Sequence, residues 1–122
     1  MAKIMVVDDD ANIRELLRKF LSRKGHEVIE ASDGKEALDR IEENPEIILL
    51  DIMMPKIHGL RVLDRIKEAS PNTEIIMMTG FALKTLGLES LQRGAFEFVT
   101  KPLDLDHVDF LISFRLAQMG SP

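Results

Sequence analysis

Charged side chains stand at or just beyond the ends of three short apolar segments of the chain. The aspartate run 8–10, Asp51 and Lys101 each follow such a segment. Apolar segments of this length, separated by helix-like stretches, are typical of buried parallel strands. Because an open parallel sheet binds its ligands beyond the carboxyl ends of its strands, we expect these charges to converge. Several carboxylates and one amine in one place suit a hard divalent cation and a phosphoryl group.

Asp8 and Asp9 are candidate ligands of the cation. Taken alone, either carboxylate is equally consistent with a helix N-terminus. A single cap is enough, however, and Asp10 or Asn12 can supply it. Two further carboxylates beside Asp51 repel one another strongly unless a cation neutralises them. Mg²⁺ prefers oxygen ligands and retains several waters, so carboxylates plus a carbonyl form a shell open to a phosphate oxygen.

Asp51 is the candidate nucleophile, because a carboxylate can attack phosphorus and form an aspartyl-phosphate. An adjacent metal neutralises the charge that builds up on the transferred group. Lys101 is a positive partner for the same oxygens, and Thr79 can donate a hydroxyl hydrogen bond to them. Each residue also has an ordinary explanation as a loop acid, a solvated lysine or a strand-end threonine. The chemical interpretation therefore depends on their being brought together.

Strand and helix patterns alternate five times along the chain. We expect strands at residues 4–7, 27–31, 47–50, 75–78 and 96–99. We expect five helices: the first before Gly25, the second capped by Ser32, the third after Gly59, a weak fourth over 83–93, and the last from Asp104 to about Met119. This alternation predicts an α/β fold, with a doubly wound, flavodoxin-like parallel sheet of order 2-1-3-4-5. Strands one and three are then neighbours.

Size and composition narrow the class of protein. The chain has 122 residues, 45% of them hydrophobic, which predicts one globular domain over residues 1–119 and a tail or linker remnant over 120–122. The absence of cysteine excludes disulfides and thiolate chemistry, and with no signal peptide visible we expect a cytoplasmic protein. A net charge of −5 argues against direct nucleic-acid contact. No apolar run suggests membrane insertion.

Four segments, IMVVDDD, IILLDIMMP, IIMMTG and FEFVTKP, occur in this order, with Gly59 four residues beyond Pro55. Together they closely resemble the receiver domains of two-component response regulators, over nearly the whole chain. The resemblance implies that Asp8, Asp9 and Asp51 bind Mg²⁺, with Mn²⁺ as an alternative, and that Met53 adds a backbone carbonyl. It also implies that Asp51 is phosphorylated.

The same resemblance implies a switch. Thr79 and Lys101 contact the phosphoryl group, the Lys101–Pro102 peptide bond is cis, and Phe98 occupies the position of an aromatic switch residue. The chain departs from many relatives after Pro55, where Lys56 replaces a glycine and His58 replaces an acid. Lysine lacks the freedom of glycine at positive φ, which affects the loop but none of the reacting groups. We interpret His58 as a loop residue.

The predicted function is phosphoryl acceptance in signalling rather than enzymatic turnover, although such a domain catalyses its own phosphorylation and dephosphorylation. The partner is a sensor histidine kinase or a histidine phosphotransfer protein. Two alternatives are a metal-dependent phosphatase with an aspartyl nucleophile and a flavodoxin-like redox carrier. The first usually has a second acid where Met53 stands, and the second usually has a loop rich in Ser, Thr and Gly where residues 8–10 are aspartates.

The last predicted helix has two distinct faces. An apolar stripe should pack on the sheet, interrupted by Arg115, whose charge should extend to water. Phe110 and Phe114 lie on the opposite side, and two exposed phenylalanines usually indicate a contact surface. In receiver domains the face formed by the fourth helix, fifth strand and fifth helix often docks a second copy or an output domain. We therefore expect Phe110 and Phe114 to belong to such an interface.

Overall fold

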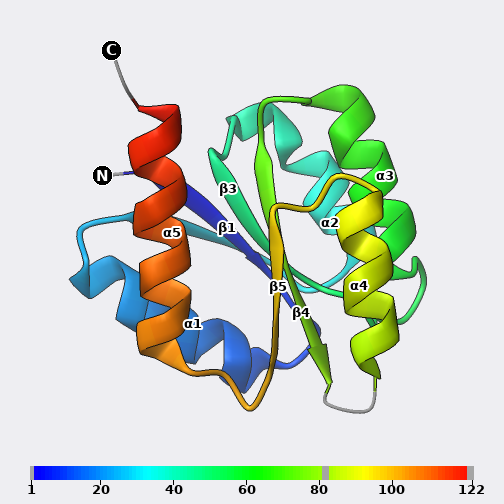
Figure 1. The fold of residues 1–122 in the computed structure, drawn as a ribbon, viewed down its shortest axis with the longest axis horizontal. Helices are drawn as coiled ribbons and strands as arrows, with labels where there is room; N and C mark the ends of the chain where they lie inside the picture. Colours follow the sequence, from blue (N-terminus) through cyan, green and yellow to red (C-terminus); the bar gives the residue numbers. More distant parts are fainter. Residues whose placement is uncertain (1, 81–82, 121–122) are drawn as a thin grey trace.

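The computed structural model describes residues 2–80 and 83–120 and contains a five-stranded parallel sheet of order β2-β1-β3-β4-β5 (Figure 1). The predicted strand order is confirmed. The strands are β1 (Lys3–Val7), β2 (Glu27–Ala31), β3 (Ile47–Asp51), β4 (Glu74–Gly80) and β5 (Glu97–Lys101). The helices are α1 (Ala11–Arg23), α2 (Gly34–Asp39), the 3₁₀ turn η1 (Ile41–Glu43), α3 (Gly59–Ala69), α4 (Lys84–Gln92) and α5 (Leu105–Met119).

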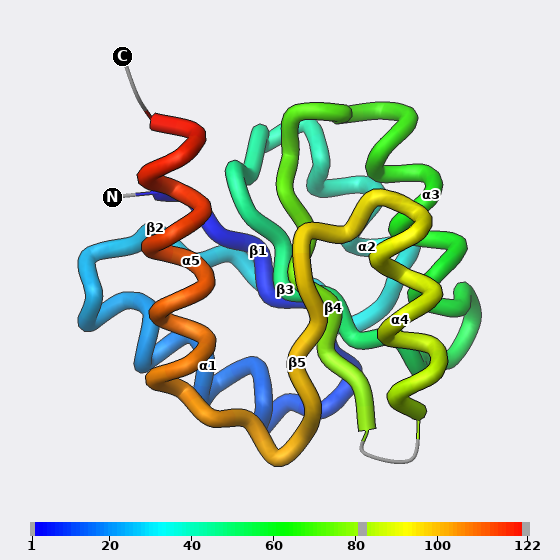
Figure 2. Tube along the Cα trace, viewed as in Figure 1, coloured from blue at the N-terminus to red at the C-terminus, as the bar shows by residue number. Residues whose placement is uncertain are grey.

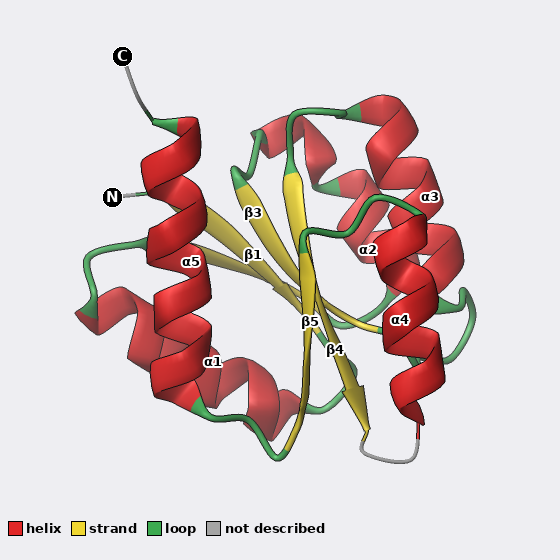
Figure 3. Cartoon of the chain, in the orientation of Figure 1, coloured by secondary structure: helices red, strands yellow, loops and turns green. Residues whose placement is uncertain are grey.

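Helices cover both faces of the sheet, α1 and α5 on one side and α2, α3 and α4 on the other (Figures 2 and 3). The strands supply alternate residues to the two apolar layers that result. In β1, Ile4 and Val6 pack toward α1 and α5, whereas Met5 and Val7 pack toward α2 and α3. Burial on both faces explains why the central strands are continuously apolar in sequence.

The first two helices begin at aspartates. The Asp10 carboxylate accepts a hydrogen bond from the Asn12 amide and caps α1, as the sequence suggested. The prediction that Ser32 caps α2 is wrong. The cap is Asp33, whose carboxylate accepts from the Glu36 amide at 2.8 Å. Ser32 precedes this cap, and its amide donates a hydrogen bond to the Glu36 carboxylate in the first turn of α2.

The second helix is shorter than its apolar pattern indicated. The apolar spacing of Ala37, Leu38 and Ile41 predicts a helix with all three on its inner face. The helix ends at Asp39, however, and Ile41 lies in the following 3₁₀ turn. Ile41 nevertheless packs against the apolar layer below α2 and α3. Asn44 then reverses the chain in the left-handed conformation, with φ of 58°, which Asn tolerates better than most residues.

The final helix has the two faces expected of it. Val108, Leu111 and Ile112 are buried against the sheet. Phe110 and Phe114 are 62% and 48% exposed, and their rings stack with centroids 6.0 Å apart. These two rings thus form a surface feature that the core does not use.

The chain closes this helix at its C-terminal end. The Gly120 amide donates to the Leu116 carbonyl at 2.8 Å, so Gly120 completes the last turn of α5, whereas Ser121 and Pro122 of the predicted tail lie outside the described residues. In the part of the chain described, no helix has both the length and the apolar character needed to span a bilayer.

Arg115 is held by the protein, contrary to the expectation that its charge extends to water. Its guanidinium donates to the Glu74 carboxylate at 2.9 Å and to Gln118 at 2.8 Å. The group also lies over the Phe96 ring, 4.7 Å from the centroid, and the side chain is only 29% exposed. Arg115 therefore ties α5 to the starts of β4 and β5.

This contact predicts an asymmetric effect of substitution. Arg115→Met leaves the half-buried Glu74 carboxylate without its partner and should lower the free energy of unfolding by ~1–2 kcal/mol. The double variant Glu74→Met/Arg115→Met should recover much of that loss, because replacing both charges by apolar groups leaves no unpaired ion. Urea denaturation followed by circular dichroism measures both values. A double variant less stable than Arg115→Met would contradict this account.

Candidate functional site

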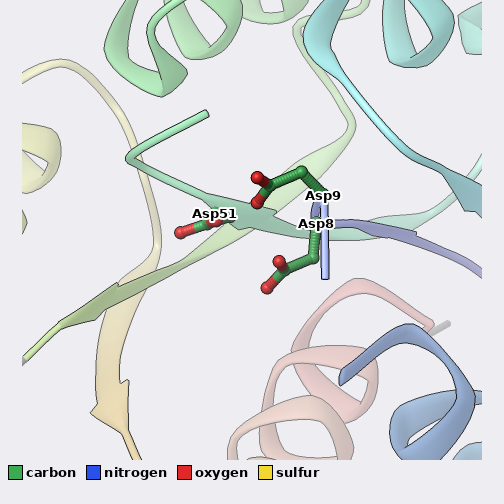
Figure 4. A group of neighbouring side chains, drawn as sticks. All are labelled: Asp8, Asp9 and Asp51. Carbon is green, nitrogen blue, oxygen red and sulfur yellow. The ribbon is translucent and has the colours of Figure 1, made fainter. Parts of the chain in front are cut away.

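Three carboxylates converge where β1 and β3 end. Asp8 directly follows β1, and Asp51 is the last residue of β3. The two strands are hydrogen-bonded neighbours, with Val7 opposite Leu50. Figure 4 shows the side chains of Asp8, Asp9 and Asp51 extending to the same side. One carboxylate oxygen from each lies within 4.8 Å of the others, so the three are within reach of a single ion.

Asp8 is fully buried, and both of its carboxylate oxygens are bound. One accepts from the Asp10 amide at 2.9 Å, and the other accepts from the Lys101 ammonium at 2.7 Å. The backbone carbonyl of Asp8 accepts from the Arg14 guanidinium at 2.7 Å. These contacts fix the end of β1 relative to α1 and β5. Arg14 was not predicted from the sequence, where its only signal was its place in the first turns after the aspartate run.

Lys101 is the last residue of β5 and reaches across the ends of the central strands. Its Nζ lies 2.7 Å from Asp8 and 3.6 Å from the Asp51 carboxylate. Burial alone would lower the pKa of Lys101, but the hydrogen bond that its ammonium donates to Asp8 and the attraction of Asp51 outweigh it, and the pKa is raised. Lys101 is thus a fixed positive charge. The Lys101–Pro102 peptide bond is cis.

Asp51 is nearly buried, and its environment is unfavourable for a second negative charge. Burial, and then the neighbouring Asp8 carboxylate, raise the pKa of Asp51 to about 6, although Lys101 and the Met53 amide act in the opposite direction. One lysine therefore does not neutralise the cluster. An added cation is the group that this arrangement of oxygen donors fits, and Mg²⁺ accepts carboxylates together with waters. Met53 itself lies on the loop just beyond and is largely exposed.

Thr79 lies at the end of β4, fully buried, with its hydroxyl directed to the start of α4. The Thr79 oxygen is 3.2 Å from the Leu83 carbonyl and 3.3 Å from the Gly80 carbonyl. Phe98, on the neighbouring strand β5, is half-buried and packs with Leu86 of α4 against the apolar layer. Thr79 thus contacts the residue that precedes α4, and Phe98 packs on the same apolar layer as Leu86 of α4.

The loop after Asp51 is held tightly against β3. The Gly59 amide donates to the Ile52 carbonyl at 2.7 Å. A Cβ at Gly59 would overlap the Asp51 carbonyl oxygen and the backbone of Ile52, so any other residue would push the loop away from the site. His58 caps α3, because its Nδ1 accepts from the Leu60 amide at 3.2 Å. The histidine therefore has a structural explanation.

Other predicted residues are not brought to this site. Phe110 and Phe114 lie on α5, on the surface. In Figure 1, β5 is the edge strand that lies between α4 and α5. The stacked rings therefore lie on α5, one of the three elements of the predicted interface, and are not among the residues of the acidic cluster.

Comparison with known proteins decides the family. The sequence profile described as "Response regulator receiver domain" matches residues 4–112. The chain belongs to the receiver domain family. It is 35% identical to the sporulation initiation phosphotransferase F of Bacillus subtilis over 107 residues, which cover 87% of this chain and 86% of that protein. A solved response regulator receiver domain protein from Clostridium thermocellum matches with a TM-score of 0.93, 29% identity and 98% coverage of both chains.

Some relatives are much longer. The regulatory protein AtoC of Escherichia coli is 33% identical over 98% of this chain, which spans only 26% of that protein. Receiver domains are phosphoacceptor signalling domains rather than conventional enzymes, and this places the chain in two-component signalling. Family membership therefore favours the receiver interpretation over the phosphatase and redox-carrier alternatives.

The receiver domain carries backbone strain beside its acidic cluster, at Lys56. This residue has φ of 73°, a conformation that side chains other than glycine rarely adopt. Its ammonium pairs with the Asp33 carboxylate at 3.2 Å, but the lysine is largely exposed, and such pairs contribute little to stability. The sequence showed the missing glycine, and the structure shows that the loop keeps the glycine conformation.

Lys56→Gly should therefore raise the free energy of unfolding by ~0.5–1 kcal/mol, as relief of the strained backbone exceeds the added flexibility of the unfolded chain. Lys56→Ala is the matched control, because it removes the ion pair and keeps the strain. Alanine should be no more stable than lysine. Thermal denaturation of the three proteins by circular dichroism gives the order, and a control as stable as the glycine variant would disprove the strain argument.

Proposed function

We propose that Asp51 accepts a phosphoryl group from the phosphohistidine of a sensor histidine kinase or a histidine phosphotransfer protein in the cytoplasm. The observation that carries this proposal is the convergence of three carboxylates and one ammonium at the ends of β1, β3 and β5. Of the two buried carboxylates, Asp51 is the one whose charge is less compensated, since Lys101 lies closer to Asp8. Its carboxylate is thus the one free to react.

In the proposed phosphoryl transfer, one bond forms and one bond breaks. A carboxylate oxygen of Asp51 forms a bond to phosphorus, the phosphorus–nitrogen bond of the donor breaks, and the imidazole leaves with the electron pair. Lys101 is already oriented by Asp8 and needs no reorganisation to face the added negative charge. The new acyl phosphate would be an anion beside Lys101, whose ammonium lies 3.6 Å from the Asp51 carboxylate.

Asp8, Asp9 and Asp51 would hold Mg²⁺, or Mn²⁺ in its place, together with the Met53 carbonyl. The bound cation supplies charge neutralisation for the approach of two anions. The protein does the rest of the positioning through buried contacts. Asp8 is oriented by Asp10 and Lys101, whereas Asp9 is exposed. Of the three proposed carboxylate ligands, Asp9 is therefore the one that contributes least to the structure of the site.

Thr79 and Phe98 would convert phosphorylation into a change of shape. The Thr79 hydroxyl now lies against the Leu83 carbonyl, and turning it to a phosphoryl oxygen would release that carbonyl. Phe98 and α4 would then repack, shifting the population between two arrangements of the α4–β5–α5 face. Phe110 and Phe114 would present that face to a second copy or to an output domain.

The assignment of Asp51 predicts the outcome of chemical phosphorylation. Acetyl phosphate should add one phosphoryl group in a reaction that requires Mg²⁺, and Asp51→Asn should abolish it because the amide is a poor nucleophile. Intact-mass spectrometry provides the measurement. Asp106→Asn, at an exposed acid on α5, is the matched control and should label normally. Undiminished labelling of Asp51→Asn would show that another residue is the acceptor.

If Phe110 and Phe114 form an interface, replacing them should abolish self-association without lowering the stability of the fold. Phe110→Ser/Phe114→Ser should leave the melting temperature close to wild type, because both rings are exposed. It should abolish self-association of the phosphorylated protein in light scattering. Leu16→Ser, at an exposed leucine on α1, is the control and should associate as wild type does. Wild type that stays monomeric in both states would remove the homodimer, and a variant melting far lower would place the rings in the core.

A further inference from the structure

The α4 helix rests on the sheet through small residues. Gly87 and Ser90 are its buried residues among those the structure describes, and the Ser90 hydroxyl donates to the Gly87 carbonyl at 2.6 Å. Large exposed residues, such as Leu88, point away from the sheet. Leu86 also packs, partly buried, against the apolar layer, but glycine and serine themselves gain little from packing, so what lies beneath Gly87 and Ser90 affects the position of the middle of the helix.

The Phe98 ring occupies the space below Gly87. A Cβ built on Gly87 would lie 2.5 Å from Cδ1 of Phe98 and 2.7 Å from both Cε1 and Cγ. Separations that short do not occur between carbon atoms that are not bonded. Any side chain at position 87 would therefore displace either the ring or the helix. Glycine is also a poor helix former, so its presence weakens α4 while it admits the ring.

A second contact lies at the N-terminal end of α4. Thr79 lies against the carbonyl of Leu83, the residue that caps the helix without a side-chain hydrogen bond. Leu83 comes four residues, about one helical turn, before Gly87. The helix is thus held at one end by the proposed phosphoryl-contacting residue and in its middle by the proposed switch ring.

We propose that Gly87 is a positioning residue that couples α4 to Phe98. Because Gly87 has no side chain, it leaves the space that the Phe98 ring occupies in the arrangement where Thr79 lies against Leu83. A methyl group at position 87 fills that space and favours the arrangement in which the ring and α4 have moved. The signalling part of this inference rests on the proposed function, whereas the contact itself does not.

A stability cycle tests the contact without any phosphorylation. The four proteins are wild type, Gly87→Ala, Phe98→Ala and the double variant, and the readout is the melting temperature by circular dichroism. Alanine at position 87 should lower the melting temperature when Phe98 is present. It should raise it when Phe98 is alanine, because the clash is gone and the gain in helix propensity remains. The same sign in both backgrounds would overturn the inference.

Phosphorylation kinetics test the coupling. Gly87→Ala should accept phosphoryl from acetyl phosphate about fivefold faster than wild type, at the low end of usual coupling factors. Thr85→Ala, at an exposed position of the same helix, is the control for helix propensity and should react at the wild-type rate. Asp51→Asn provides the blank.

Amide NMR spectra provide a readout that mere destabilisation does not move. Before phosphorylation, resonances of α4 and β5 in Gly87→Ala should be displaced toward their positions in phosphorylated wild type. An unchanged rate with undisplaced resonances would overturn the coupling. Failure of wild type to label at Asp51 would overturn the proposed function and the coupling with it, and the stability cycle would still report on the contact between Gly87 and Phe98.

Discussion

A buried carboxylate requires partners, and the contacts of Asp8 organise this whole end of the molecule. The Lys101 ammonium binds Asp8 at 2.7 Å, which links the edge strand β5 to the central strand β1 across the intervening ends of β3 and β4. The Asp10 amide and the Arg14 guanidinium bind Asp8 from α1. Because Lys101 is committed to Asp8, the nearby Asp51 remains under-compensated. The same ion pair that orders the site thus leaves in it the carboxylate that we propose as the phosphoryl acceptor.

Backbone strain and charge repulsion both occur in the segment 51–59, which begins beside the Asp8–Lys101 ion pair. Asp51 is held in an environment that raises its pKa, and Lys56 is held at positive φ in the loop that follows. Gly59 fits so closely under that loop that no side chain is tolerated. Local preferences and the overall fold usually agree in a protein, and the places where they disagree tend to be functional. Here the disagreements lie around one carboxylate.

Much of this arrangement could be predicted from the sequence, because the sheet topology brings the clustered charged groups together. Once alternating strands and helices indicated a doubly wound sheet, residues such as Asp8, Asp51 and Lys101 had to meet at the strand ends. The exposed side of α5 followed in the same way from helical periodicity. These predictions required only the direction of each strand and the identification of the apolar face of each helix.

What could not be predicted depends on distances between elements. Whether Ser32 or Asp33 caps α2 depends on one residue of register. The pairing of Arg115 with Glu74, forty-one positions away, requires the packing of α5 on the sheet. The fit of Phe98 beneath Gly87 is a contact between atoms of two elements, and a glycine in a weak helix gave no indication of it.

The central claim is that the carboxylate cluster is a cation site, and the exposed Asp9 offers the most direct test. Binding of Mg²⁺ to the folded state alone should raise the melting temperature of wild type. Asp9→Asn should melt no lower than wild type without Mg²⁺, because repulsion is relieved, and should lose most of the Mg²⁺-dependent rise. The measurement is circular dichroism melting at matched ionic strength, with NaCl as the control. An equal rise in wild type and Asp9→Asn, or no rise in wild type, would contradict the account.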